Sequence, residues 1–305
     1  MLEKIKAIKD TCIKNQADKE LWPSYFNRRY LEFLSYYETL PVKKFDNVLE
    51  LGCGIGYNTA FISQLATNVV ATDMEVIDPT THSPGLKITR EFLKELNITN
   101  VEVRHASAEN LPFEDNSFDM VISIHVLEHV PDREKAIKEI NRVLKKGGIN
   151  FCVTPTRMDR IYAFFINYIY IAKRTFYHLL VKPFKKTDKN NLPESASKNS
   201  VISTDNSFIK SLPFPPAHGA FKNYLSELKN WSFYKWEKLI TDNGKHELLN
   251  SSSSQILPIL PLLGSAFPSA AVYSHRLTRK FEFFLGKLYF IKTFGISSII
   301  ITKKG

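Results

Sequence analysis

Between residues 45 and 155 the chain alternates short apolar runs with longer segments whose apolar residues recur at helical spacing. The apolar runs predict five strands, at residues 47–51, 68–72, 101–105, 118–124 and 149–154. The intervening segments predict helices at residues 58–66, 84–96 and 132–144. Asp132 is the expected N-cap of the third helix, and Gly147-Gly148 are expected to stop it. This alternation is typical of parallel βαβ units that cross over right-handed.

We take residues 46–155 as the core, and outside it the pattern predicts three further parts. Residues 1–45 are expected to form a helical N-terminal extension. Residues 156–230 read as an insertion or lid that contains a polar, Lys-, Asn- and Ser-rich stretch at 185–206. Residues 231–305 are expected to begin with a helix from Ser232 to Asp242 and to add strands at 246–251 and 297–302. An apolar insert at 256–290, broken by prolines in its first part, lies between those strands.

Composition indicates an ordinary globular protein that can form a large core without disulfides or structural metal ions. Of the 305 residues, 44% are hydrophobic and 24% are charged, which is ordinary for a folded domain. The three cysteines are few and widely spaced, so neither a disulfide framework nor a structural zinc site is expected. A reducing, cytoplasmic compartment fits this cysteine usage.

The net charge of +10 is partly concentrated beside aromatic residues. Residues 161–172 are apolar and aromatic and are followed at once by lysines, and a second basic and aromatic run covers residues 276–292. The first run is too short to span a bilayer, which takes about 20 apolar residues. Two interpretations stay open: a solvated basic face, or attachment to an anionic surface, either lipid headgroups or nucleic acid. Because the bases accompany bulky apolar residues and no RNA-binding module is recognisable, we favour peripheral attachment at the inner face of the membrane over nucleic acid.

Gly52, Gly54 and Gly56 lie where the first strand must turn into a helix. A ligand can approach the backbone of such a turn closely, because no Cβ is in the way. In a doubly wound sheet the turn lies at the carboxyl edge, where ligands bind. The glycines alone are also compatible with nicotinamide or flavin cofactors.

The surrounding residues narrow the choice of ligand. Glu50 precedes the glycines, and a carboxylate there suits a cationic amino group better than a pyrophosphate. Asp73 closes the second strand, where a carboxylate can accept hydrogen bonds from both ribose hydroxyls. The segment 107–113 follows the third strand, and residues 116–119 open the fourth.

With these motifs, residues 46–154 resemble the small-molecule methyltransferases of the class I S-adenosylmethionine-dependent superfamily, including those of quinone and sterol biosynthesis. The matching segments are residues 48–56, 106–113, 116–119, 126–132 and 142–148. The resemblance implies an α/β fold with a Rossmann-like, seven-stranded, mostly parallel sheet whose last strand is antiparallel. It also implies S-adenosyl-L-methionine as the cofactor.

The resemblance assigns the cofactor contacts to individual residues. Glu50 and Gly52 are expected to flank the methionine end, Asp73 to hold the ribose, and Ala108 to offer its backbone N–H to adenine. The expected set is completed by Gly54, Gly56, Met74, Ser107 and His125. Ser107 departs from the family, which often has Asp at this position, so its contact with the adenine amino group lacks charge.

Methyl transfer from a sulfonium needs alignment and desolvation, and a base only when the acceptor must lose a proton. His125 and His129 follow the fourth strand and are candidate bases. His218, in a proline-rich turn, is a third candidate that faces the acceptor. No metal is expected, although His125, Glu128 and His129 resemble a metal site in ubiquinone O-methyltransferases. The alternative is that these side chains shape the pocket or cap the next helix.

The segments outside the core are expected to select the acceptor. Because residues 161–186 and 256–273 are strongly apolar, we expect an amphiphilic acceptor: a small molecule, a lipid or a lipid-linked glycan, methylated on oxygen. Two alternatives stay open. One is a non-catalytic protein that binds S-adenosylmethionine for regulation or scaffolding, and the other is a methyltransferase acting on a soluble metabolite or RNA.

Overall fold

The computed structural model describes residues 2–17, 23–74, 86–161, 164–165, 223–242, 246–254 and 276–305. Several predictions from the sequence lie outside these residues. They include His218, almost all of the aromatic segment 161–186, the polar stretch 185–206 and the proline-broken run 256–273.

The described elements alternate as the sequence predicts. The helices are α1 (Leu2–Ala17), α2 (Pro23–Thr39), α3 (Tyr57–Ile62), α4 (Leu86–Glu95), α5 (Arg133–Val143), α8 (Tyr224–Asn230), α9 (Phe233–Asp242) and α12 (Arg276–Lys287), with a short 3-10 helix η4 (Ile291–Phe294). The strands are β1 (Phe45–Leu51), β2 (Ala66–Asp73), β3 (Val101–His105), β4 (Phe118–Ile124), β5 (Leu144–Pro155), β6 (His246–Ser254) and β7 (Ser297–Lys304).

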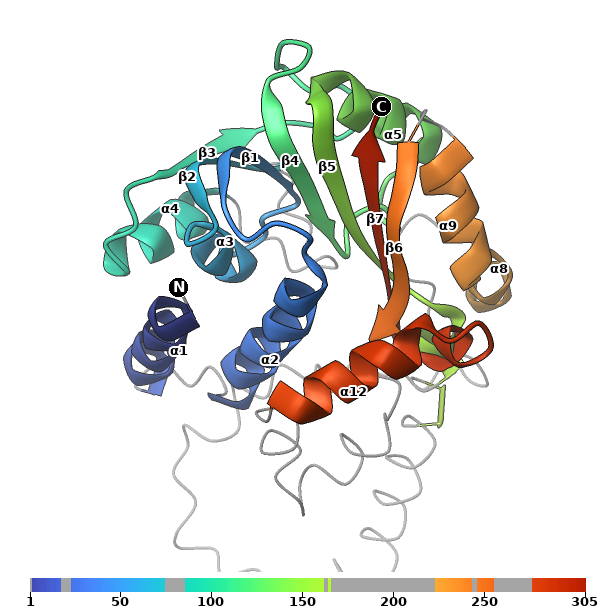
Figure 1. Ribbon diagram of the computed structural model, residues 1–305. Coiled ribbons are helices and arrows are strands. Elements are labelled where there is room, and N and C mark those ends of the chain that lie inside the picture. Colours follow the sequence, from blue (N-terminus) through green and yellow to red (C-terminus); the bar gives the residue numbers. More distant parts are fainter. Residues whose placement is uncertain are drawn as a thin grey trace, which may run out of the picture.

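One seven-stranded sheet organises the molecule, in the order β3-β2-β1-β4-β5-β7-β6 (Figure 1). The pairs β1–β2, β1–β4, β2–β3 and β4–β5 are parallel, whereas β7 runs antiparallel to both β5 and β6. The strand order reverses between β1 and β4, which is the switch point at which ligands bind in such sheets. The predicted fold class, with an antiparallel last strand, is confirmed.

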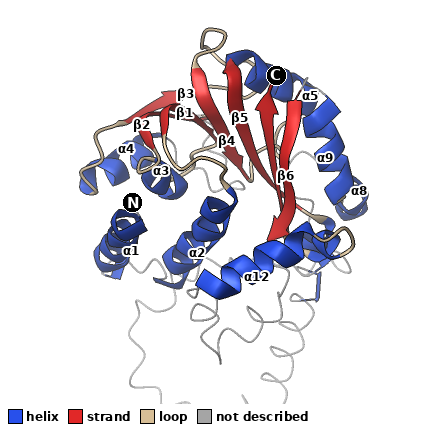
Figure 2. Ribbon diagram, viewed as in Figure 1, coloured by secondary structure: helices blue, strands red, loops and turns tan. Residues whose placement is uncertain are grey.

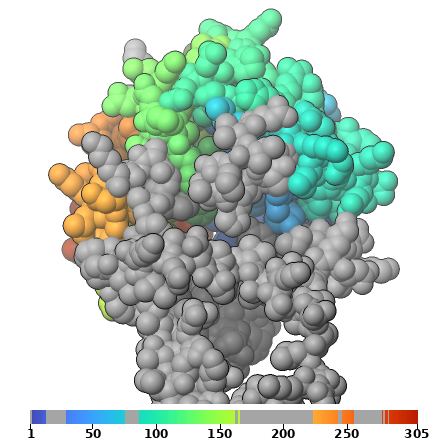
Figure 3. Space-filling model, turned by 180° about the vertical axis from the view of Figure 1, so that it is seen from behind, coloured from blue at the N-terminus to red at the C-terminus, as the bar shows by residue number. Residues whose placement is uncertain are grey.

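Alternate residues of each central strand face opposite layers of helices. In β4, Met120 and Ile122 pack with α1, α2 and α3, whereas Val121 packs with α5 and α9. Figure 2 shows these two helical layers around the sheet. Viewed from behind, the segment from α4 to β5 (cyan to green) forms much of the coloured surface, with α8 and α9 (orange) at its margin (Figure 3). The continuous apolar runs of the sequence arise because both faces of these strands are covered.

Two predicted boundaries are wrong. The third helix ends at Val143 rather than at residue 144, and β5 already begins at Leu144, so Gly147 and Gly148 lie inside a strand. Gly147 has φ +77°, and the pairing between β4 and β5 shifts register there, so these glycines form a bulge instead of stopping a helix. The first core helix ends at Ile62 rather than at residue 66, because β2 begins at Ala66.

The C-terminal part confirms the two strands expected at 246–251 and 297–302, and α9 begins directly after Ser232, as predicted. Helix α12 lies against β6 and α2 and crosses the lower end of β6 in Figure 1. In the parts of the chain that the structure describes, no helix is long and apolar enough to cross a membrane.

Candidate functional site

The glycine turn after β1 has left-handed backbone geometry at three positions. Gly52, Gly54 and Gly56 have φ values of +67°, +53° and +88°, which residues with a side chain rarely adopt. The Cys53 N–H donates to the carbonyl of Thr72 on the neighbouring strand (2.9 Å), which holds the turn against the end of β2. Gly56 is the N-cap of α3, so the turn leads directly into the N-terminus of a helix.

The glycines differ in what surrounds them. A Cβ on Gly52 would lie 2.3 Å from Cγ2 of Val126, so this glycine allows the loop after β4 to pack on the turn. Within the described parts of the chain, a Cβ on Gly54 would meet nothing within 4 Å. Gly54 therefore borders open space, and a ligand can approach its backbone there.

Glu50, near the end of β1, is a buried carboxyl group with an unsatisfied atom. The side chain is 3% exposed, and Oε2 has no hydrogen-bond partner among the residues that the structure describes. Burial raises the pKa of Glu50 to about 8, a net value in which the hydroxyl of Thr59 lowers the pKa and the nearby charge of Asp73 raises it. A buried carboxylate without a partner is costly, so this position suits a cationic ligand group that restores its charge.

Asp73 at the end of β2 accepts hydrogen bonds from the glycine turn and from the residue that follows Asp73. Its Oδ2 accepts the N–H of Gly54 (2.6 Å) and its Oδ1 accepts that of Met74 (2.7 Å). Burial raises the pKa of Asp73, whereas these two amides and the nearby His129 and His105 lower it. Each carboxylate oxygen has a second lone pair, so acceptor capacity remains for ribose hydroxyls. Met74 itself is 44% exposed.

The loop after β3 reaches the same edge. The Ala106 N–H donates to the carbonyl of Asp73 (3.1 Å), which places the loop beside the ribose candidate. The Ser107 hydroxyl accepts the N–H of Glu109 (3.2 Å), and Ser107 forms an isolated bridge with Asn110. Ser107 therefore shapes the turn that presents Ala108, a role that its position in the sequence did not indicate.

His125 follows β4 and lies between two polar side chains. Its φ is +56°, an uncommon geometry that His tolerates better than most residues. Its Nδ1 lies 3.4 Å from Oε1 of Glu128, and its Nε2 lies 3.4 Å from the hydroxyl of Ser297 at the start of β7. Among the described residues both oxygens of Glu128 are buried without a hydrogen-bond partner, and His125 and the charged Arg133 are the polar groups near this carboxylate.

His129 and Glu128 do not form a metal site with His125. His129 is exposed and lies near Asp73, whereas Glu128 is buried beside His125. Within the described ranges, no group of three His, Cys, Asp or Glu side chains is placed to hold a metal ion.

Three residues of this edge were not predicted from the sequence. Thr89 on α4 donates its hydroxyl to the carbonyl of Gly54 (2.5 Å), Val126 packs on Gly52, and Ser297 faces His125. Thr89 carried a weak signal, because it is a polar residue on the buried side of an amphipathic helix. Ser297 carried none, because it lies 172 positions from His125.

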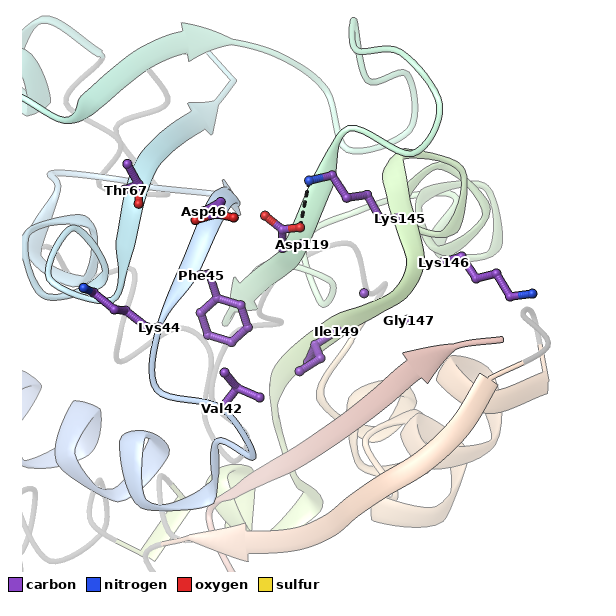
Figure 4. Close-up of a pocket in the computed structure, with 11 residues that line it drawn as sticks. Val42, Lys44, Phe45, Asp46, Thr67, Asp119, Lys145, Lys146, Gly147 and Ile149 are labelled. Carbon is purple, nitrogen blue, oxygen red and sulfur yellow. Dashed lines mark hydrogen bonds and ion pairs between the residues drawn. The ribbon is translucent and has the colours of Figure 1, made fainter.

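A pocket of about 410 Å³ opens at the opposite, amino edge of the sheet (Figure 4). Phe45, Asp119 and Ile149 line it from β1, β4 and β5, and Lys145 is paired with Asp119 at 2.8 Å. Ligands of doubly wound sheets bind at the carboxyl edge, so this pocket is separate from the candidate site.

The carboxyl-edge site has the features that a nucleoside with a cationic amino-acid tail requires. It offers an unpartnered buried carboxyl at Glu50, open space at Gly54 and acceptor capacity at Asp73. The strand order and the layout of this site resemble those of class I methyltransferase domains, a class that uses S-adenosylmethionine.

Residues 49–152 match the family model described as a methyltransferase domain. The demethylmenaquinone methyltransferase of Listeria welshimeri is 38% identical over 116 residues, which cover 38% of this chain and 48% of the relative. That of Staphylococcus aureus is 32% identical over 138 residues, covering 42% and 53%. The chain thus matches about half the length of these relatives. An S-adenosylmethionine-dependent methyltransferase structure from Mesorhizobium loti aligns over 90% of this chain and 98% of its own, with 12% identity and a TM-score of 0.48.

Proposed function

We propose that the protein transfers the methyl group of S-adenosylmethionine to a hydroxyl oxygen of an amphiphilic, quinone-like or other lipid-like acceptor. The observation that carries the donor is Glu50, whose buried Oε2 has no partner at the end of β1. The name of the curated relatives, demethylmenaquinone methyltransferase, supports an acceptor of the quinone class. The apolar runs 161–172 and 256–273 support the amphiphilic character of the acceptor.

The chain's own residues divide the task between binding and proton transfer. In this proposal Glu50 holds the cationic amino group, Asp73 holds the ribose, and the loop of Ser107 and Ala108 holds the adenine. The bound cofactor supplies an electrophilic methyl group on a sulfonium, which is a good leaving group. The S–CH₃ bond breaks as the O–CH₃ bond forms, and the acceptor hydroxyl loses its proton to a base.

His125 is our candidate for that base. It follows β4 at the switch point of the sheet, and Glu128 faces its Nδ1 from a buried position. A carboxylate in this place orients the imidazole, as a third group does in other base-assisted sites. Nε2 then faces Ser297 and the carboxyl edge, where an acceptor hydroxyl is expected.

Calorimetry and a transfer assay test the proposed function together. We expect the purified chain to bind S-adenosylmethionine and its demethylated product, and Asp73→Ala to weaken both by about tenfold or more, because two ribose hydrogen bonds are lost. With labelled donor and a native lipid extract, label is expected in a lipid product. Absence of binding by either compound would contradict the donor assignment. Binding without transfer to any lipid, metabolite or RNA fraction would favour a non-catalytic regulatory protein.

His125→Asn is expected to lower kcat by about 100-fold or more, because a general base contributes about 10² to 10⁴ to the rate. Asn is chosen because it also tolerates the left-handed backbone at this position. Affinity for S-adenosylmethionine should fall much less than kcat, because the base acts on the acceptor.

Glu128→Gln is the matched variant for the positioning group. We expect a smaller fall in kcat than for His125→Asn, because the buried carboxylate no longer orients the imidazole through its Nδ1. A kcat unchanged in both variants would assign His125 and Glu128 to loop structure alone.

A further inference from the structure

Helix α12 leaves an apolar stripe on the surface. Leu277, Phe281 and Phe284, which we call the docking face, follow one another at spacings of four and three residues, so they share one side of the helix, and Leu288 follows directly after its end. Leu277 is 82% exposed, Phe281 57% and Phe284 60%. Apolar residues arranged in this way normally face a core.

The opposite side of α12 is the one that packs on the protein. A Cβ on Gly286 would lie 2.2 Å from the carbonyl oxygen of Ser253, so the helix backbone approaches the end of β6 closely. Gly286 is buried, and its direction around the helix is opposite to that of Phe281 and Phe284. The docking face therefore points away from the sheet.

The apolar surface continues beyond the helix. Tyr289, Phe290 and Phe294 follow with exposed fractions of 65%, 78% and 53%. Contiguous exposed aromatic residues of this extent mark an interaction surface rather than ordinary solvent-facing positions.

Basic residues border this surface. Residues 276–292 contain five Lys or Arg and one Glu. Lys280 and Lys287 are exposed beside the docking face, and the ammonium of Lys287 lies 4.2 Å from the ring centre of Phe283. Lys292 is different, because it is buried and paired with Glu237 at 3.2 Å, so it supports η4 instead of facing a partner.

The position of α12 connects this surface to the site. Ser253 and Ser254 end β6, which runs in the same direction as β5, so α12 packs at the carboxyl edge of the sheet. Ser297, which faces His125, pairs with Ser254 at this edge. The docking face and the candidate reactive residues thus belong to one edge of the molecule.

We propose that the docking face of α12, with Tyr289, Phe290 and Phe294, inserts into the headgroup region of an anionic lipid bilayer. Aromatic and aliphatic side chains enter the boundary of the acyl chains, while Lys280 and Lys287 contact the phosphates, as in helices that lie in a membrane interface. The helix lies in the plane of the bilayer and does not cross it. The bilayer would then supply the acceptor to the carboxyl edge, and this role rests on the proposed function. The membrane binding itself rests only on the geometry of α12.

Vesicle flotation of the full chain tests the surface. We expect binding to vesicles of phosphatidylcholine mixed with phosphatidylglycerol, and weaker binding to phosphatidylcholine alone. Phe281→Ser/Phe284→Ser should weaken partitioning by about 100-fold, since each buried Phe contributes about tenfold or more. Lys280→Glu/Lys287→Glu should abolish the preference for the anionic vesicles.

The matched control is Leu225→Ser/Leu248→Ser, which removes two exposed apolar side chains from α8 and β6, away from α12. Its partitioning should equal that of the wild type, and all variants should keep wild-type affinity for S-adenosylmethionine. Equal binding by the Phe variant and the control would overturn the proposal. So would a change from dimer to monomer in the Phe variant by light scattering, or binding to an oligonucleotide that only the Lys variant loses. Vesicle binding without S-adenosylmethionine binding would refute the proposed function and leave this surface intact.

Discussion

Glu50→Gln is expected to weaken S-adenosylmethionine binding by about 100-fold at pH 8, because it removes one partner of a buried charge pair, a loss of about 2 to 5 kcal/mol. The same substitution is expected to stabilise the ligand-free protein at that pH. The two effects share one cause. A buried carboxyl group whose oxygen has no partner among the described residues destabilises the ligand-free protein when it is ionised. Beside a cationic ligand group, the same carboxylate stabilises the complex.

The pH dependence of stability follows from the raised pKa. Burial raises the pKa of Glu50 from 4.5 to about 8, so between these values the folded state keeps a proton that the unfolded state has released. The contribution of Glu50 to the free energy of unfolding is therefore fully present below pH 4.5 and is lost as the pH rises towards 8. Urea unfolding of the ligand-free protein at pH 5 and pH 8 should show this loss in the wild type and a reduced loss in Glu50→Gln. Equal losses in the two proteins would contradict the assignment.

Cofactor binding should also release a proton. At pH 7 Glu50 is largely protonated in the empty site, and a bound ammonium group favours its ionised form. Calorimetric titration in two buffers of different ionisation enthalpy measures this release. Glu50→Gln should release correspondingly fewer protons, whereas Asp73→Ala should still release the Glu50 proton, with weaker affinity. An identical proton count in wild type and Glu50→Gln would show that Glu50 does not meet the amino group.

The sequence predicted most of the sheet because hydrophobic burial dictates it. Strands β3 and β4 have the predicted bounds, since each is a short apolar or alternating run between polar turns. The error at β5 has a physical reason. Glycines after a helix usually stop it, but here Gly147 serves a bulge that lets β5 pair with β4 from Leu144 onward.

The sequence predicted which candidate cofactor residues lie together, but it did not predict the contact between His125 and Ser297. Glu50, Gly54 and Asp73 lie near strand ends in order along the chain, so topology alone brings them together. The approach of Ser297 to His125 depends on the packing of β7 against β5, which no local pattern encodes. His129 directly follows Glu128 in the sequence, yet the side chain of Glu128 is buried and that of His129 is exposed. The two side chains diverge in the turn after β4, where the His129 N–H donates to the carbonyl of Val126.

Gly52→Ala is expected mainly to lower the free energy of unfolding, whereas Gly54→Ala is expected mainly to weaken S-adenosylmethionine binding, although both glycines belong to one turn. Alanine at either position must adopt a left-handed backbone, which costs about 1 to 2 kcal/mol. At Gly52 the new Cβ also meets Val126, and such overpacking costs about 1 to 3 kcal/mol more. Urea unfolding should therefore show a loss of about 3 kcal/mol for Gly52→Ala and about 1 kcal/mol for Gly54→Ala.

Affinity for S-adenosylmethionine should rank the two variants in the opposite way. The Cβ of Gly54→Ala enters the open space where the ligand approaches the backbone, so binding should fall by about 100-fold while the protein stays folded. Adding Val126→Ala to Gly52→Ala removes the two methyl groups that clash, so the double variant should regain the overpacking part of the lost stability and keep the backbone strain. If Gly54→Ala binds as tightly as the wild type, the open space beside Gly54 is not the ligand site, and the turn serves the fold alone.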